Sequence, residues 1–226
     1  MRRKLKVLFI STIIIISIIG IIVVAEKILE KNNTGIKEII DNIAQKEETT
    51  TEDPFLLSDE VIKNYLTPNE YSRPGKELKE VNAIVVHYVG NPGTTAAQNR
   101  SYFENLKDTH ATSASSHYII GMEGEIIQCV PLNEISYASN NRNKDTIAIE
   151  CCHPDETGQF TTATYKSLVK LVAALCRTYD LDPETGIIRH YDVTGKYCPL
   201  YYFNHEDEWY GFKLDVKAEL AAVNTK

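Results

Sequence analysis

The stretch VNAIVVHYV, residues 81–89, decides the fold class of this chain. It is a continuous apolar run rich in β-branched residues, which is typical of a strand buried on both faces. The loop GNPGTT follows, and then residues 94–108, whose apolar positions recur at helical spacing after Thr94 or Thr95 near the N-cap. A buried strand that leads directly into a helix indicates an α/β unit.

The same alternation continues along the chain. HYIIG and EIIQCV flank residues 122–124 and predict a β-hairpin, and TIAIECC at 146–152 predicts another buried strand. Residues 162–179 have one apolar face and predict the longest helix. GIIRH predicts a short strand, and residues 214–223 predict a closing helix. Strands interleaved with helices indicate a mixed sheet covered by helices.

The N-terminus has the features of a membrane anchor. Residues 7–25 contain no charge and span roughly 28 Å as a helix, close to the thickness of a bilayer core. The basic stub at 1–6 predicts a cytoplasmic N-terminus. A signal peptide cleaved after Ala25 is the alternative, although the apolar run is longer than signal peptides usually have. We therefore predict an N-terminal transmembrane helix.

A stalk is expected between the anchor and the main domain. Isoleucines recur at helical spacing over residues 36–43, and the polar segment QKEETTTEDP ends at Pro54. We assign 26–53 to a stalk and linker and 54–226 to the main domain. The predicted location is the cell membrane, single-pass, with this domain extracytoplasmic, or secreted if the N-terminal segment is cleaved.

Charge narrows the choice of partner. The chain carries −7 overall, and residues 1–31 hold six basic and two acidic side chains, so the remainder carries −11. An acidic body argues against nucleic acid as a partner, because binding to phosphate backbones needs a basic surface.

Five cysteines follow the anchor, and an odd number leaves at least one unpaired. Cys129 and Cys176 are expected to be small buried apolar side chains. Adjacent Cys151 and Cys152 should point to opposite faces of a strand, and their pairing stays open.

RHYDVTGKYCP at 189–199 places His190 and Cys198 eight positions apart. Three readings are open: a zinc site, a thiol nucleophile with its base, or a surface turn. Catalytic zinc takes three protein ligands from histidine, cysteine and carboxylates and leaves a fourth position open. Gly195 would let the loop fold back so that both side chains face one ion.

Two histidines compete as third ligand. His87 lies near the carboxyl end of its strand, where ligands collect in α/β sheets, but it could equally be a core histidine. His117 opens a strand in a similar way. The histidines at 110, 153 and 205 lie in polar sequence and are predicted to be surface residues.

Two charged residues are candidates for proton transfer and charge stabilisation. Glu150 lies within an apolar strand, where a carboxylate is costly unless it is paired or functional. It is a candidate general base, with a structural ion pair to a lysine or arginine as the alternative. Lys196 flanks Cys198 and is either an oxyanion-stabilising group or a solvated loop residue.

Six ordered segments carry a family resemblance over about residues 60 to 215. They are NEYSRPG, AIVVHYVGNPGTTA, NRSYFENL, SSHYIIGMEGEIIQCVP, DTIAIECC and IIRHYDVTGKYCP. Together they resemble the zinc-dependent N-acetylmuramoyl-L-alanine amidases of the type-2 amidase family, which share their fold with phage amidase lysozymes and peptidoglycan recognition proteins. The resemblance implies a single mixed, mostly parallel β-sheet covered by helices.

The resemblance also implies a site and a reaction. One Zn²⁺ would lie on His87, His190 and Cys198, with Glu150 activating the attacking water and Lys196 polarising the substrate amide oxygen. The implied partner is peptidoglycan, cut between the lactyl group of N-acetylmuramic acid and L-alanine of the stem peptide. His117 would then have no part in metal binding. Two alternatives remain: a non-catalytic peptidoglycan-binding protein of this fold, and a thiol hydrolase with Cys198 as nucleophile and His190 as base.

Overall fold

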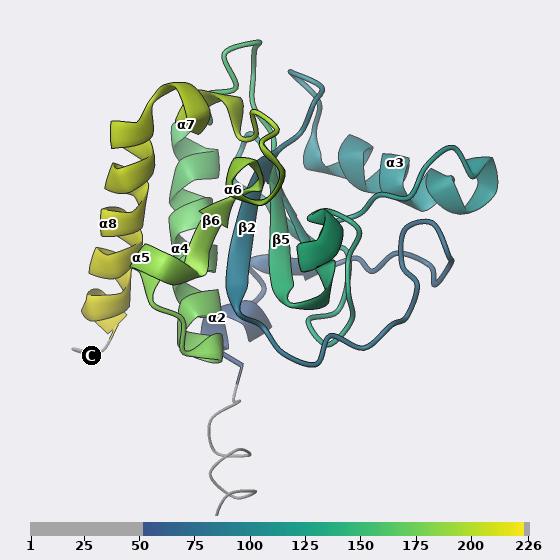
Figure 1. The fold of residues 1–226 in the computed structure, drawn as a ribbon, viewed down its shortest axis with the longest axis horizontal. Helices are drawn as coiled ribbons and strands as arrows, with labels where there is room; N and C mark the ends of the chain where they lie inside the picture. The colour runs from purple at the N-terminus through teal and green to yellow at the C-terminus, as the bar shows by residue number, and fades with distance from the viewer. Residues whose placement is uncertain (1–51, 224–226) are drawn as a thin grey trace, which may run out of the picture. The chain divides into compact units, whose positions relative to one another are not determined.

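The structure, a computed structural model, describes residues 52–223 (Figure 1). The predicted basic stub, transmembrane helix and stalk helix lie outside these residues. The described part contains one six-stranded sheet in the order β1-β4-β3-β5-β2-β6. Its strands are β1 (Val61–Lys63), β2 (Ala83–Tyr88), β3 (Tyr118–Ile120), β4 (Ile126–Gln128), β5 (Thr146–Cys151) and β6 (Ile187–Arg189).

The sheet is mixed and mostly parallel, which confirms the predicted fold class. Strands β3 and β4 form the expected antiparallel hairpin. The pairs β1–β4, β5–β3, β5–β2 and β2–β6 are all parallel. Strands β3, β5, β2 and β6 therefore run in one direction, and their carboxyl ends meet at one edge of the sheet.

Helices cover both faces of the sheet. Figure 1 shows α4 (Thr162–Tyr179) and α8 (Glu206–Val223) on one side and α3 (Ala96–Thr109) on the other. Phe212 and Leu171 are fully buried in the core on the α4 and α8 side, and Phe103 and Leu106 of α3 belong to a separate apolar cluster. Burying these two clusters against the sheet is the main source of stability expected for this layered arrangement.

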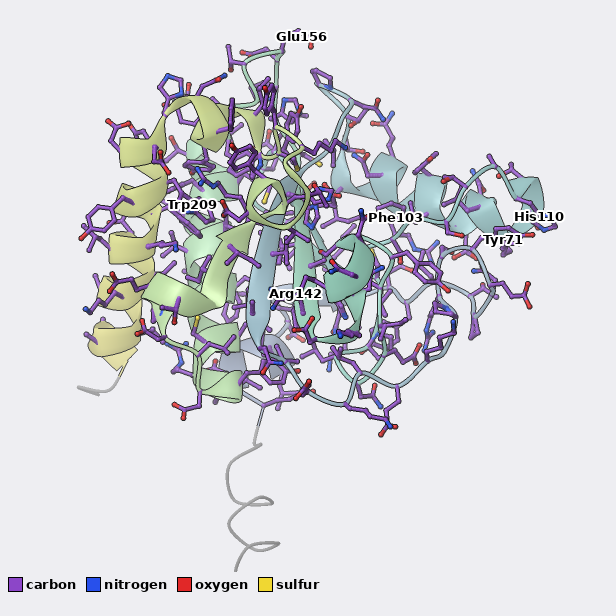
Figure 2. The ribbon with its side chains drawn as sticks, in the orientation of Figure 1. Tyr71, Phe103, His110, Arg142, Glu156 and Trp209 are labelled. Carbon is purple, nitrogen blue, oxygen red and sulfur yellow. The ribbon has the colours of Figure 1, made fainter. Side chains whose placement is uncertain are left out.

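The long predicted elements are present. Helix α3 begins after Thr95, one of the two threonines predicted near the N-cap, and the Thr95 side chain forms a capping box with Gln98. At its other end, Tyr71 stacks on His110 with ring centroids 4.3 Å apart (Figure 2). The closing helix was predicted to begin at residue 214, but α8 begins at Glu206.

Several short elements were not predicted. They are β1, α2 (Pro54–Leu57), the 3₁₀ turn η1 (Asn140–Lys144), α5 (Pro183–Gly186), α6 (His190–Thr194) and α7 (Leu200–Asn204). No helix within 52–223 is both long and apolar enough to cross a membrane.

All five cysteines are buried and free. Cys129 and Cys176 are buried apolar side chains, as predicted. Cys151 belongs to the apolar cluster under α4, and Cys152 belongs to the cluster under α3. The two neighbours therefore point to opposite faces of the sheet at the end of β5, which confirms that prediction.

Candidate metal centre

Three candidate residues lie in one row at the carboxyl edge of the sheet. In the register of β2 and β5, His87 is paired with Glu150. On the other side of β2, Val86 is paired with Arg189, so His190 follows at the level of His87. Paired positions on neighbouring strands point to the same face. The register thus aligns two imidazoles and a carboxylate across β5, β2 and the end of β6.

The loop after α6 brings Cys198 to this row. Gly195 ends α6 with φ of 77°, a left-handed conformation that suits glycine. The Tyr191 N–H then donates to the Cys198 carbonyl over 2.9 Å, which folds the loop back. The Cys198 side chain is buried as a result.

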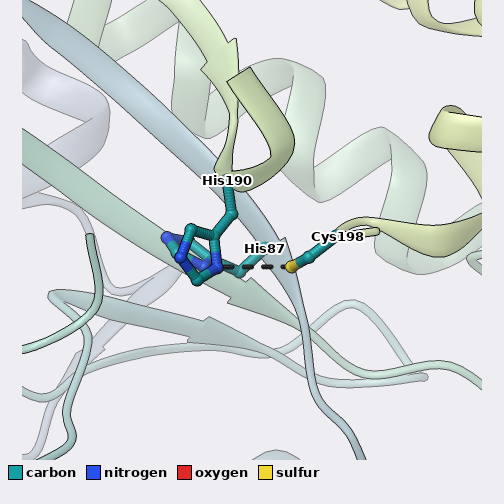
Figure 3. Close-up of side chains that lie close together, drawn as sticks. All are labelled: His87, His190 and Cys198. Atoms are coloured by element: carbon teal, nitrogen blue, oxygen red, sulfur yellow. Dashed lines mark hydrogen bonds between the residues drawn. The ribbon is translucent and has the colours of Figure 1, made fainter. Parts of the chain in front are cut away.

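The donor atoms of His87, His190 and Cys198 converge (Figure 3). All lie within 4.8 Å of one another. The Cys198 Sγ is 4.0 Å from His87 Nδ1, and the two imidazole centroids are 4.6 Å apart. His190 Nε2 is buried and has no hydrogen-bond partner within the described residues. A buried nitrogen without a partner is costly, and a metal ion would use its lone pair. Two nitrogens and one sulfur could therefore hold a metal ion.

The electrostatics favour neutral imidazoles. Burial lowers the pKa of His87 well below its ordinary value, and the charges of His190 and Lys196 act in the same direction. Burial and Lys196 likewise lower the pKa of His190. Only the unprotonated nitrogen binds a metal, so both rings are in the form that a ligand requires.

Cys198 is a poor free nucleophile in this environment. Burial and the neighbouring Glu150 raise the pKa of the Cys198 thiol to about 12, and a backbone hydrogen bond from Tyr88 and the charge of Lys196 oppose this only in part. Reactive cysteines have lowered pKa values, because the thiolate is the nucleophile. A metal ion deprotonates a thiol that coordinates it, so the same side chain can serve as a ligand.

Glu150 faces the cluster with one oxygen free. Its Oε1 lies 3.9 Å from His87 Nδ1, and its buried Oε2 has no hydrogen-bond partner within the described residues. Burial raises the pKa of Glu150 to about 8, against an opposing effect of Lys196. Within 52–223, no lysine or arginine forms an ion pair with Glu150, which argues against the structural alternative.

Lys196 is exposed on the loop between Gly195 and Cys198. Its charge is near enough to lower the pKa of His87 and to oppose the rise at Glu150. The loop therefore supplies a positive charge at the mouth of the cluster.

His117 does not join the cluster. Its ring is buried, with Nε2 2.9 Å from the Glu134 carbonyl and Nδ1 3.0 Å from the Ala148 N–H. Both nitrogens are thus occupied by the protein.

His110 and His205 are exposed as predicted, but the prediction for His153 was wrong. His153 is buried, with its ring nitrogens 2.6 and 2.7 Å from the carbonyl oxygens of Val89 and Asp155. The loop that carries His153 folds over the end of β2 and buries the ring. The polar sequence around His153 gives no sign of this contact.

One contact of the cluster has no signal in the sequence. Ser139 Oγ lies 3.2 Å from His87 Nε2, and both side chains are buried. Ser139 is 52 residues from His87 and stands in a polar stretch without periodicity. Only the folded chain brings the two together.

Sequence comparisons agree with this geometry. The model of a family described as N-acetylmuramoyl-L-alanine amidase matches residues 77–200, more than half of the chain. The N-acetylmuramoyl-L-alanine amidase BlyA of Bacillus subtilis (strain 168) is 32% identical over 178 residues, covering 70% of this chain and 47% of BlyA. CwlL of Bacillus licheniformis, with the same enzyme name, is 32% identical over 173 residues, covering 71% of this chain and 47% of CwlL. The chain spans about half the length of the curated relatives it matches.

Solved structures share the fold. The catalytic domain of XlyA superposes with a TM-score of 0.59 at 23% identity, covering 69% of this chain and 98% of that domain. PlyL gives a TM-score of 0.59 at 23% identity, covering 69% of this chain and 96% of PlyL. With the match over residues 77–200, these findings show that the chain belongs to the N-acetylmuramoyl-L-alanine amidase family.

Proposed function

We propose that this chain is a peptidoglycan hydrolase. It cleaves the amide bond between the lactyl group of N-acetylmuramic acid and L-alanine of the stem peptide. The observation that carries the proposal is the buried convergence of His87, His190 and Cys198 beside a carboxylate with one unpaired oxygen. Membership of the family and the names of the relatives support the reaction class.

The donor set fits one Zn²⁺ ion. Two imidazole nitrogens and one thiolate form a three-ligand set of the kind that catalytic zinc sites use, with a fourth position left for water or substrate. The unpartnered Nε2 of His190 is consistent with such a ligand. A bound zinc ion would polarise the substrate carbonyl and lower the pKa of a water molecule to about 7.

Glu150 handles the protons in this proposal. Its free Oε2 takes up a proton from the water that attacks the carbonyl carbon, and then delivers it to the leaving nitrogen of L-alanine. The raised pKa of Glu150, about 8, suits a group that must both accept and release a proton near neutral pH. The Lys196 ammonium stabilises the negative charge that develops on the carbonyl oxygen.

The test combines metal analysis with product analysis. Purified walls are digested with zinc-loaded wild type, Glu150→Gln and Glu156→Gln, and the released peptides are identified by mass spectrometry. Glu156 is an exposed carboxylate on the loop after β5 and serves as the matched control. We expect one zinc per chain in all three proteins, and a loss of activity of about 10²–10⁴-fold only in Glu150→Gln.

Three outcomes would contradict the proposal. Wild-type activity in zinc-loaded Glu150→Gln would remove Glu150 from the mechanism. Activity that survives chelation would exclude zinc and favour the thiol hydrolase. Tight binding of muropeptides without turnover by the zinc-loaded protein would favour the non-catalytic binding protein.

The proposal extends to location. The uncharged run at 7–25 anchors the chain in the membrane, and the amidase domain then faces the cell wall. Cell fractionation combined with N-terminal sequencing of the mature protein tests this. An intact N-terminus in the membrane fraction is expected, whereas a secreted protein starting after Ala25 would show a cleaved signal peptide.

A further inference from the structure

The two ring nitrogens of His87 have different surroundings. Nδ1 faces the site, 4.0 Å from Cys198 Sγ and 3.9 Å from Glu150 Oε1. Nε2 points the other way and lies 3.2 Å from Ser139 Oγ. Both His87 and Ser139 are buried, so water does not compete for either nitrogen.

These contacts determine which nitrogen can bind a metal. A neutral imidazole has one N–H donor and one acceptor nitrogen, and a metal ion binds only the acceptor. The Ser139 hydroxyl oxygen can accept a hydrogen bond from Nε2–H, which leaves the lone pair on Nδ1. That lone pair points to the side of the ring where Cys198 lies.

Ser139 is itself held in place by the turn that follows it. The side-chain oxygen of Asn143 accepts hydrogen bonds from the Ala138 and Ser139 N–H groups at 3.1 and 2.6 Å. The Ser139 carbonyl accepts from the N–H of Arg142 in η1 over 2.9 Å. Figure 2 shows Arg142 on this turn, beside β5. The backbone of Ser139 is therefore fixed from both directions, and its hydroxyl is presented to the ring.

We propose that Ser139 is a positioning residue for the metal centre. It accepts a hydrogen bond from Nε2–H of His87, selects the tautomer with the lone pair on Nδ1 and fixes the plane of the ring. Asn143 supports this role by holding the backbone at Ser139. The inference rests on the proposed function, because it requires a zinc ion at His87. Partners of this kind behind ligating histidines tune metal affinity by about 10–100-fold.

The chain contains a matched control for this contact. Ser136 Oγ lies 3.1 Å from Nδ1 of His117, and both side chains are buried. This second serine–histidine pair is not part of the cluster of His87, His190 and Cys198, and the His117 nitrogens contact the Glu134 carbonyl and the Ala148 N–H. Ser136→Ala thus removes a similar buried serine–histidine hydrogen bond and changes no residue of the proposed metal centre.

The experiment measures zinc affinity by competition with a chromogenic chelator in wild type, Ser139→Ala and Ser136→Ala. We expect the Kd for zinc to rise about 10–100-fold in Ser139→Ala and to stay within about twofold in Ser136→Ala. Asn143→Ala should give an intermediate rise. Urea unfolding of the metal-free variants separates loss of affinity from loss of fold.

A second measurement on the wild type needs no variant. In ¹⁵N-histidine-labelled, zinc-loaded protein, His87 should bind zinc through Nδ1 and show a protected Nε2–H proton. Coordination through Nε2 would overturn the inference, as would an unchanged Kd in Ser139→Ala. In both cases zinc still binds, and the proposed function stands. A wild type that binds no zinc would overturn both.

Discussion

His117 provides a quantitative test of how burial controls a histidine outside the metal centre. Its Nδ1 lies 3.0 Å from the Ala148 N–H and 3.1 Å from Ser136 Oγ, and its Nε2 lies 2.9 Å from the Glu134 carbonyl. A main-chain N–H can only donate, so Nδ1 must accept and the proton must lie on Nε2. Protonating the ring would place two donors against each other at Nδ1.

The resulting loss of stability in acid can be calculated. Burial lowers the pKa of His117 from 6.5 to about 4, against the opposing effect of the Glu134 carbonyl and charge. Between these values the unfolded chain binds a proton that the folded chain does not, so stability falls as pH falls. The contribution of His117 is fully present above pH 6.5. It loses about 2 kcal/mol by pH 5 and about 3 kcal/mol by pH 4.

Urea unfolding of metal-free wild type and His117→Gln, at pH 7.5 and pH 5, measures this contribution. A chelator is present throughout, because protonation of metal ligands would add its own pH dependence. His117→Gln should be less stable at pH 7.5, and the difference from wild type should shrink by about 2 kcal/mol at pH 5. Gly124→Ala, which changes no titratable group, should stay parallel to wild type. Parallel curves for wild type and His117→Gln would refute the reasoning.

Three further substitutions test other parts of the structure. Gly124→Ala should lower the free energy of unfolding by about 1–3 kcal/mol in urea, because Gly124 has φ of 88° and an added Cβ would lie 2.9 Å from Ser167 Oγ. An unchanged midpoint would contradict this turn geometry. Cys198→Ser should retain the fold by circular dichroism but lose zinc on dialysis, since it removes the only sulfur ligand proposed; full retention of zinc would exclude that role. His153→Leu removes the contact of the ring with the Val89 carbonyl and with the Asp155 carbonyl, of which the second still accepts from the Gly158 N–H. It should destabilise the chain by about 1–3 kcal/mol, with faster hydrogen exchange in the loops after β2 and β5; unchanged exchange would show that the ring does not tie these loops together.

The elements that could be predicted are those with a long uniform pattern. Helix α4 has an apolar stripe over five turns, and its predicted and observed bounds agree. Strand β1 has only three residues, too few to show a period. The start of α8 was missed because Gly211 interrupts its pattern, although the acidic residues of its first turn suit a helix N-terminus.

Burial of polar residues was harder to predict than secondary structure. His153 lies in the polar segment HPDETG, which is typical of an exposed loop. In the folded chain this ring stacks against Tyr88 with centroids 5.0 Å apart and reaches two carbonyl oxygens. A buried backbone carbonyl that has no partner in the sheet, such as that of Val89 after β2, needs a hydrogen-bond donor from elsewhere in the chain. The local sequence around His153 cannot predict this contact, because the Val89 carbonyl lies 64 residues away in the chain.

The candidate site contains residues that a sequence pattern predicts and contacts that no local pattern predicts. His87 and Glu150 each stand near the end of an apolar strand, and both could be selected from the sequence for that reason. Their alignment depends on the strand order β5-β2-β6 and on the parallel register, which pairs His87 with Glu150 and sets His190 one step beyond the Val86–Arg189 pair. A shift of β2 by one residue would turn His87 to the face opposite Glu150 and His190. The backbone pairing of β2 therefore places two of the three proposed ligands, His87 and His190, while the loop after α6 brings Cys198 to them. The Ser139 hydroxyl contacts a ring that the sheet has already placed.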